Sequence, residues 1–210
     1  MNSKTKKMTT RQIITSILLL LGAVLAFLPL SGKYSLRTKP EYVLTTVLDE
    51  GNSFSADQVA RFVVTEDSTL QLIDVRTPEE FRECNIPGSV NIPYSEFLKK
   101  EPGAYLDDPG MRHIFYSDDD IYASYAQTLA VGLGFKNCFV MKGGLNAWYA
   151  TIMNSEFEGD KISARENALF ETRFRARSLF NEVNSMPDSL KLAYIASKRF
   201  DPKKLDGGCE

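Results

Sequence analysis

The feature that most restricts the fold is an alternation of two patterns between residues 55 and 153. Short apolar runs, of the kind that form buried strands, are each followed by a stretch with the periodicity of a helix. Strands that alternate with helices predict a mostly parallel sheet covered by helices on both faces, which is a three-layer α/β fold. The expected strands are Leu70–Val75, Val90–Ile92, His113–Tyr116 and Cys138–Met141.

Capping signals indicate where the helices begin. Ser55 with Gln58, and Thr77 with Glu80, each form the pattern of a capping box, in which two side chains satisfy backbone N–H groups at a helix start. Ligands of parallel α/β sheets bind beyond the carboxyl ends of the strands. The turn Ser117–Ile121, which follows a predicted strand, is therefore the place to look for a site. Further helices are expected at Tyr122–Gly134 and Leu145–Met153.

Four motifs carry a family resemblance. LIDVRTPEEF, IPGSVNIP, HIFYS and KGGLNAW resemble the rhodanese-like (sulfurtransferase) family in their order and spacing, over about half of the chain. The resemblance implies a rhodanese-like domain at residues 55–158. It also implies a structural motif made of Asp74, Arg76, Pro87, Gly88, Gly143, Gly144 and Trp148.

The resemblance fails at the loop where the family holds its active site. Active members carry Cys-x-x-Gly-x-Arg after the strand that corresponds to His113–Tyr116, and the cysteine becomes a persulfide. In this chain Ser117 stands at the cysteine position, Asp120 replaces the glycine and Tyr122 replaces the arginine. The degenerate loop consists of Ser117, Asp118, Asp119, Asp120, Ile121 and Tyr122.

These replacements are chemically severe. A thiolate is nucleophilic near neutral pH, whereas a serine hydroxyl needs a base. The sole histidine, His113, lies inside a predicted strand, where a structural role is expected. Three aspartates oppose an anionic substrate, and loss of glycine removes easy access to positive φ. The sequence therefore predicts no catalytic residue in this loop and a degenerate member of the family.

The acidic loop has two further interpretations. The carboxylates could contribute to a calcium or magnesium site, or they could form a solvated turn that caps the next helix. Loops that bind calcium or magnesium need ligands at alternating positions and usually a glycine. A turn that caps the next helix is therefore favoured, and no metal site is expected. No cofactor is expected either.

The three cysteines offer little to replace the missing thiol. Cys138 lies in an apolar strand and is expected to be a small buried hydrophobe, and nothing near Cys84 suggests a lowered pKa. Cys209 follows Gly207-Gly208 near the end of the sequence, where an exposed thiol could accept sulfur or be inert. Cys209 is therefore the candidate reactive thiol.

The amino-terminal segment predicts membrane attachment. Residues 1–11 form a basic leader with no acid, and residues 12–32 are uncharged. The apolar centre Ile13–Leu30 would span about 27 Å as a helix, close to the thickness of the hydrocarbon layer. The basic flank places the N-terminus in the cytoplasm, so that the domain would lie outside the cell or inner membrane. A cleaved signal peptide is the alternative, although the residues before Ser31 make a poor cleavage site.

The remaining segments are a linker or helix at residues 33–54 and a helical basic extension at residues 159–210. Apolar residues recur at helical spacing through residues 161–186, and a second helix is expected after Pro187. The extension could pack on the domain, or its basic surface could touch anionic lipid or a partner.

The sequence thus predicts a membrane-anchored, catalytically inactive rhodanese-like protein with a binding or scaffold role. The membrane lipid is the expected partner of the N-terminal helix, and a protein partner is possible. A net charge of -2 gives no reason to expect nucleic-acid binding. Two alternatives stay open: sulfur transfer through Cys209, and recognition of a cationic ligand by the acidic loop.

Overall fold

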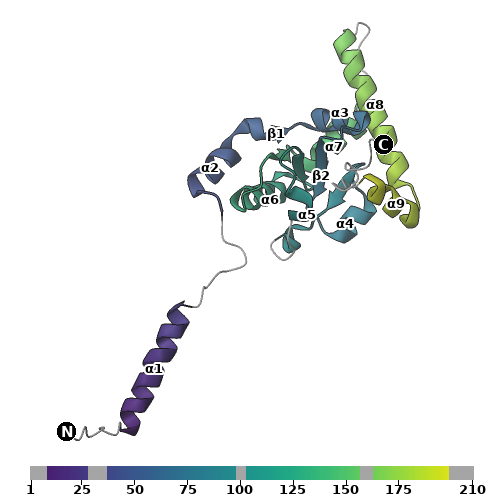
Figure 1. Cartoon of the computed structure of the whole chain (residues 1–210). Coiled ribbons are helices and arrows are strands. Elements are labelled where there is room, and N and C mark those ends of the chain that lie inside the picture. The colour runs from purple at the N-terminus through teal and green to yellow at the C-terminus, as the bar shows by residue number, and fades with distance from the viewer. Residues whose placement is uncertain (1–8, 28–36, 98–102, 157–162, 199–210) are drawn as a thin grey trace, which may run out of the picture. The chain divides into compact units, whose positions relative to one another are not determined.

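The computed structural model describes residues 9–27, 37–97, 103–156 and 163–198. The chain divides into two compact units, Met1–Ser35 and Leu36–Glu210 (Figure 1). Within its described residues, the first unit holds a single helix, α1 (Thr10–Phe27). All the strands described below belong to the second unit.

Helix α1 is the described part of the expected membrane segment. Its apolar side chains between Ile13 and Val24 are exposed. Among the described residues, however, no helix combines the length and the apolarity needed to cross a membrane. The expected transmembrane helix at residues 12–32 is therefore not confirmed. Residues 28–32 of that span, and the basic leader before residue 9, lie outside the described residues.

The second unit is built on a sheet of five parallel strands in the order β1-β5-β4-β2-β3. This confirms the predicted parallel sheet and its four expected strands; the two-residue strand β1 at one edge was not predicted. The central pair is in register from Leu70 opposite Arg112 to Asp74 opposite Tyr116, so both strands end at the same edge of the sheet. The strands are β1 (Ser53–Phe54), β2 (Leu70–Asp74), β3 (Ser89–Asn91), β4 (Arg112–Tyr116) and β5 (Cys138–Met141).

Helices lie on both faces of the sheet, as expected for three layers. The two predicted capping boxes are present, Ser55 with Gln58 and Thr77 with Glu80. The longer helices are α2 (Pro40–Leu48), α3 (Ala56–Thr65), α6 (Asp120–Gly132), α8 (Ala164–Asn184) and α9 (Asp188–Lys198). The shorter elements are η1 (Glu50–Asn52), α4 (Pro78–Glu83), η2 (Tyr94–Glu96), α5 (Gly103–Leu106), α7 (Gly144–Trp148) and the π-helical turn η3 (Tyr149–Met153).

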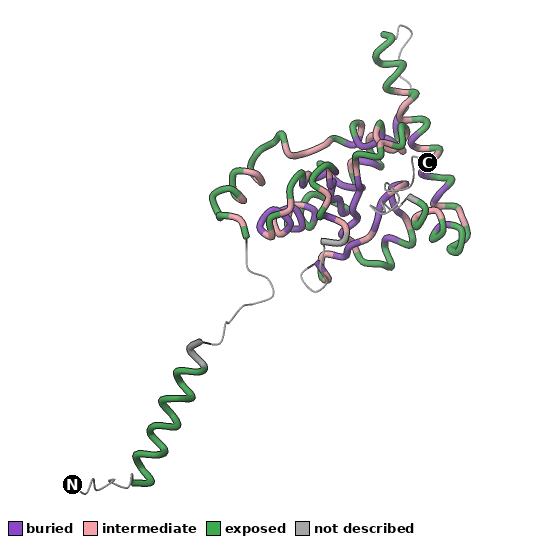
Figure 2. The backbone as a smooth tube through the Cα atoms, viewed as in Figure 1, coloured by how far each residue is buried: buried purple, intermediate pink, exposed green. Residues whose placement is uncertain are grey.

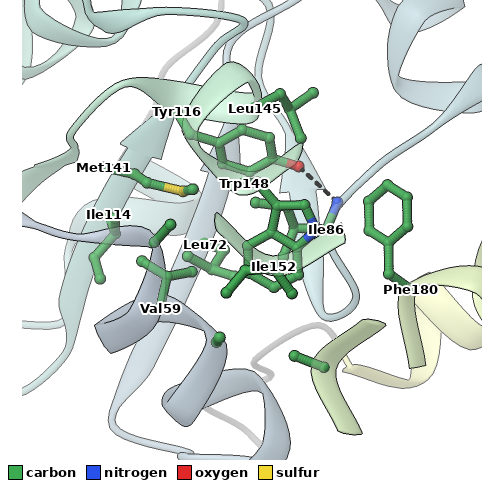
Figure 3. Packing of buried hydrophobic residues seen from close by; sticks show 13 residues of the cluster. Val59, Leu72, Ile86, Ile114, Tyr116, Met141, Leu145, Trp148, Ile152 and Phe180 are labelled. Atoms are coloured by element: carbon green, nitrogen blue, oxygen red, sulfur yellow. Dashed lines mark hydrogen bonds between the residues drawn. The ribbon is translucent and has the colours of Figure 1, made fainter. Parts of the chain in front are cut away.

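Two hydrophobic cores fill the space between the layers. Figure 2 shows that the buried positions concentrate in the strands and on the helix sides that face them. The core toward α3, α7 and α8 contains Trp148 and Tyr116, which are fully buried (Figure 3). The phenol of Tyr116 accepts a hydrogen bond from the backbone N–H of Ile86 at 3.2 Å. The second core, toward α5 and α6, contains Phe97 and Phe115.

Helix α8 of the C-terminal extension contributes to the first core. Phe180 of α8 is only 4% exposed, and its ring lies 6.0 Å from that of Trp148. The guanidinium of Arg173 forms two hydrogen bonds of 2.7 Å to the carboxylate of Asp57 on α3. Lys191 of α9 is buried and donates a hydrogen bond to the carbonyl of Arg82 at 2.6 Å. Of the two predicted roles for the extension, packing on the domain is confirmed for α8, and it uses several of the basic residues.

Candidate functional site

The loop Ser117–Tyr122 lies where it was expected, directly after β4, and its last three residues form the first turn of helix α6. It borders a cavity of about 400 Å³ at the carboxyl edge of the central strands. Residues from the end of β2, from α4 and from η2 complete the walls. The lining residues are Val75, Arg76, Thr77, Glu80, Pro93, Tyr94, Ser95, Ser117, Asp118, Asp119 and Tyr122.

The side chain of Ser117 is buried and hydrogen-bonded within the loop. It is only 2% exposed, and its hydroxyl donates a hydrogen bond to the carbonyl of Asp119 at 2.6 Å. His113 is four residues earlier, about 13 Å away along an extended strand, and fully buried. Burial lowers the pKa of His113, and the backbone and charge of Asp108 oppose this only in part. The one histidine of the chain therefore does not serve Ser117 as a base.

Each aspartate of the loop has its own structural partner. Asp118 forms an ion pair with Arg76 at 3.3 Å. Asp119 is the N-cap of α6 and accepts a hydrogen bond from the N–H of Ile121 at 2.9 Å. Asp120 accepts a short hydrogen bond from the N–H of Gly143. The predicted capping role is confirmed for Asp119, and α6 begins at Asp120, two residues before the predicted start.

These contacts have a chemical consequence for anion binding. Backbone N–H groups at a helix start or in a tight turn are the donors that bind anionic ligands. Here Asp119 and Asp120 supply the carboxylates themselves, so the N–H groups of Ile121 and Gly143 are already engaged. The loop thus contains its own negative charge in place of a bound anion.

Arg76, from the motif Asp74-Val75-Arg76, is a cation that forms an ion pair with the loop. Its Nε and Nη2 atoms donate to the carboxylate of Asp74, which is fully buried, at 2.7 to 3.2 Å. Nη2 also donates to the carbonyl of Cys84 at 2.7 Å. Burial alone would lower the pKa of Arg76, but the adjacent Asp74 carboxylate raises it above its ordinary value. The charge of Arg76 is therefore balanced inside the protein before any ligand binds.

The glycine pair of the KGGLNAW motif explains how the loop is anchored. The N–H groups of Leu145 and Asn146 donate to the carbonyls of Ser117 and Asp118 at 2.9 and 3.0 Å. Gly144 has φ of +52°, and a Cβ at this position would collide with the carbonyl of Ser117. A residue with a side chain at position 144 would push the loop away from α7.

The other motif residues have structural positions away from the loop. Trp148 is fully buried in the core toward α8. Pro87 and Gly88 border a different cavity, of about 240 Å³, which is also lined by Tyr194 of α9. Gly88 has φ of +82°, which favours glycine in this turn. The structure therefore brings only Asp74, Arg76 and the glycine pair to the loop.

The two thiols among the described residues, Cys84 and Cys138, do not line the cavity beside the loop. Cys138 is buried in β5, and burial raises its pKa to about 12. Cys84 is half-buried, with its sulfur 3.3 Å from the hydroxyl of Tyr149. Cys209, the predicted reactive thiol, lies outside the described residues. Among the described residues, no group of three or more potential ligands comes together as a metal site.

A tyrosine cluster beside the cavity was missed by the sequence reasoning. The ring of Tyr94 lies 5.5 Å from that of Tyr122 and 6.0 Å from that of Tyr125. The rings of Tyr122 and Tyr125 are about half exposed. The spacing of Tyr122 and Tyr125 on one helical face was a readable signal, but Tyr94 is contributed by the distant turn η2.

The fold and the loop define an α/β domain in which Ser117 directly follows a central parallel strand and precedes a helix. Residues 55–151 match the family model for the rhodanese-like domain. This chain therefore contains a rhodanese-like domain at residues 55–151.

Proteins of two kinds are among those that resemble the chain. It is 29% identical over 106 residues to thiosulfate:glutathione sulfurtransferase of Saccharomyces cerevisiae, covering 46% of this chain and 76% of that protein. It is 28% identical over 138 residues to human centrosomal protein of 41 kDa, covering 62% of this chain and 37% of that protein. The chain thus spans little more than a third of the second relative. A solved human single-domain sulfurtransferase is 25% identical, with a TM-score of 0.41, covering 48% of this chain and 96% of that structure.

Proposed function

We propose that the rhodanese-like domain is catalytically inactive at its loop and acts as a binding or scaffold domain. The observation that carries the proposal is the state of Ser117, whose buried hydroxyl is bonded to the carbonyl of Asp119. A protein partner is the expected ligand of such a domain, and no cofactor is needed for this role.

The first supporting step concerns the nucleophile. Sulfur transfer requires a group that attacks sulfur and then carries it, and a thiolate does both. A serine hydroxyl would first have to lose its proton to a base. His113 is buried at the other end of β4, and the carboxylates next to Ser117 are engaged with Arg76, Ile121 and Gly143.

The second supporting step concerns the substrate. Thiosulfate and related sulfur donors are anions, and the cavity beside Ser117 is lined by three carboxylates and one guanidinium. Because the guanidinium of Arg76 is bonded to the buried Asp74, it contributes little attraction for an incoming anion. The acidic side chains therefore oppose the binding of an anionic donor.

A thiosulfate:cyanide sulfurtransferase assay tests the proposal. The purified chain should show no turnover above background, and Ser117→Ala should be indistinguishable from it. The turnover of Ser117→Cys should also stay near background, because the carboxylates of the loop are still present and oppose an anionic donor. Activity that disappears in Ser117→Ala would refute the proposal, and strong activity in Ser117→Cys would show that the loop is not an obstacle.

Membrane attachment is the second part of the proposal. We propose that residues 12–32 anchor the chain in the cell membrane, with the N-terminus cytoplasmic and the domain on the other side. The uncharged stretch, its basic flank and the exposed apolar side chains of α1 support this. The chain should stay in the membrane fraction after a carbonate wash. A soluble protein that begins near residue 33 would identify a cleaved signal peptide instead.

Sulfur transfer through another thiol is the alternative function. It is favoured by the resemblance to thiosulfate:glutathione sulfurtransferase of yeast, which carries that activity in its name. Cys209 is the thiol that we propose for this alternative. Turnover that is lost in Cys209→Ser and kept in Ser117→Ala would establish it, whereas absence of turnover in the unmodified chain would exclude it.

A further inference from the structure

We propose that the cavity beside the Ser117–Tyr122 loop binds an arginine side chain of a partner polypeptide. This inference rests on the proposed binding role and names the chemistry of the partner. An anion site attracts negative charge, whereas the proposed site attracts positive charge. Both the tyrosine cluster and the acidic loop contribute to this binding.

The cavity beside the loop has an aromatic wall. A space of about 400 Å³ is large enough for one long side chain. Tyr94 and Tyr122 both line it, with ring centroids 5.5 Å apart and planes inclined by 51°. Val75 and Pro93 add apolar surface at the same cavity. This wall fits the methylene stem of an arginine and offers a ring face to its guanidinium.

The lining of the cavity carries an excess of negative charge. Three carboxylates, those of Glu80, Asp118 and Asp119, face one guanidinium, that of Arg76. Arg76 forms an ion pair with Asp74, which does not line the cavity, so Asp74 already balances the charge of Arg76. Hydrogen bonds from Thr77 hold the pKa of Glu80 below its ordinary value, and this carboxylate is ionised at neutral pH. The cavity is therefore complementary to a cation.

Each of the two aspartates has a hydrogen bond at its Oδ1 atom, with Arg76 for Asp118 and with Ile121 for Asp119. Both residues are exposed, and 59% of the side chain of Asp118 is accessible. A guanidinium presents several N–H donors in one plane, so it can bond to a carboxylate oxygen while it stacks on a tyrosine ring. These features favour arginine over the compact ammonium of lysine.

Binding of a labelled peptide to the 210-residue chain in nonionic detergent tests the proposal. The probe is a blocked nonapeptide of alternating glycine and arginine, and a peptide of alternating glycine and lysine is compared with it at low ionic strength. Asp118→Asn/Asp119→Asn should weaken binding of the arginine peptide about threefold to tenfold. Asparagine keeps the capping oxygen at position 119, so the loop should stay folded. Tyr122→Leu should weaken binding about twofold to fivefold.

A matched control separates the cavity from general attraction to an acidic protein. Glu171 and Glu182 are exposed on α8, and Glu171→Gln/Glu182→Gln removes the same amount of charge away from the loop. This variant should bind the arginine peptide within about twofold of the unmodified chain. Equal losses in the two acidic double variants would overturn the proposal, because they would indicate non-specific attraction. An unchanged affinity in Tyr122→Leu, or equal binding of the two peptides, would also overturn it.

The sulfurtransferase assay keeps this inference distinct from the proposed function. Turnover that depends on Ser117 would refute the proposed inactivity, whether or not the arginine peptide binds. A chain without turnover that binds the peptide equally well in all variants would refute only the assignment of the cavity to arginine.

Discussion

Replacing Phe180 with alanine should destabilise the domain by about 3 kcal/mol, because this side chain joins the C-terminal extension to the core. Phe180 is 4% exposed, and its ring lies against those of Trp148 and Tyr149 at 6.0 and 5.8 Å. Truncation of a buried phenylalanine to alanine costs roughly 3–5 kcal/mol. We expect the lower end of that range, since Phe180 is on an outer helix that can shift toward the gap.

Urea unfolding gives the measurement. Trp148 is the only tryptophan of the chain and is fully buried beside Phe180, so its fluorescence reports on this part of the core. With a slope of about 1–3 kcal/mol per molar urea, a loss of 3 kcal/mol lowers the unfolding midpoint by about 1–3 M. The near-native spectrum of the variant in buffer would show that it still folds.

The same helix supplies the control. Phe174 also lies on α8 but is 54% exposed, so Phe174→Ala should change the free energy of unfolding by about 0.5 kcal/mol or less. A small effect of Phe180→Ala, similar to that of Phe174→Ala, would refute the conclusion that α8 belongs to the core. It would leave the extension as a helix that rests loosely on the domain.

Two further predictions concern titratable groups. Because burial lowers the pKa of His113, the folded state resists protonation that the unfolded state accepts; its contribution to stability is full above about pH 6.5 and falls as the pH decreases from there. His113→Leu should therefore lose less stability than the unmodified chain between pH 7.5 and 5.5, and parallel losses in the two proteins would contradict this. Burial also raises the pKa of Cys138 to about 12, so iodoacetamide added to the folded protein should alkylate the half-buried Cys84 but not Cys138. Mass spectrometry of the two cysteine-containing peptides measures the alkylation, and equal labelling would contradict the burial of Cys138 in β5.

The local signals of the sequence were sufficient for the framework of the domain. Ser55 and Thr77 each start a helix with a partner three residues away, so both capping boxes could be read directly. The apolar runs identified β2 and β5 because these strands are buried. The two-residue strand β1 has no such run, since its formation depends on pairing with β5.

The contacts that define the site could not be read in the same way. Asp120 bonds to Gly143, which is 23 residues later, and Arg173 pairs with Asp57, which is 116 residues earlier. No local pattern encodes such pairs, because they form only when distant elements meet in the fold. The sequence correctly predicted that the acids could cap α6, but it could not show that a second one would accept a hydrogen bond from Gly143, the residue before α7.

The chemistry of a cysteine placed in the loop should reveal which of two opposing effects dominates there. The start of α6 favours a thiolate through its N–H groups and dipole, whereas the carboxylates of Asp118, Asp119 and Asp120 disfavour it. Since Asp119 and Asp120 already engage nearby N–H groups, we expect the carboxylates to dominate in Ser117→Cys. The thiol should then have a pKa above its ordinary value of about 8.5.

Changing the three aspartates to asparagine in the Ser117→Cys background should lower that pKa by roughly one unit. The pH dependence of iodoacetamide alkylation, followed by mass spectrometry, measures the thiol in both variants, and Cys84 in the same samples serves as the internal reference. A thiol that already titrates below pH 7 with the aspartates in place would contradict the argument. The loop would then retain an anion-binding cradle, and the proposed inactivity would rest on the missing sulfur atom alone.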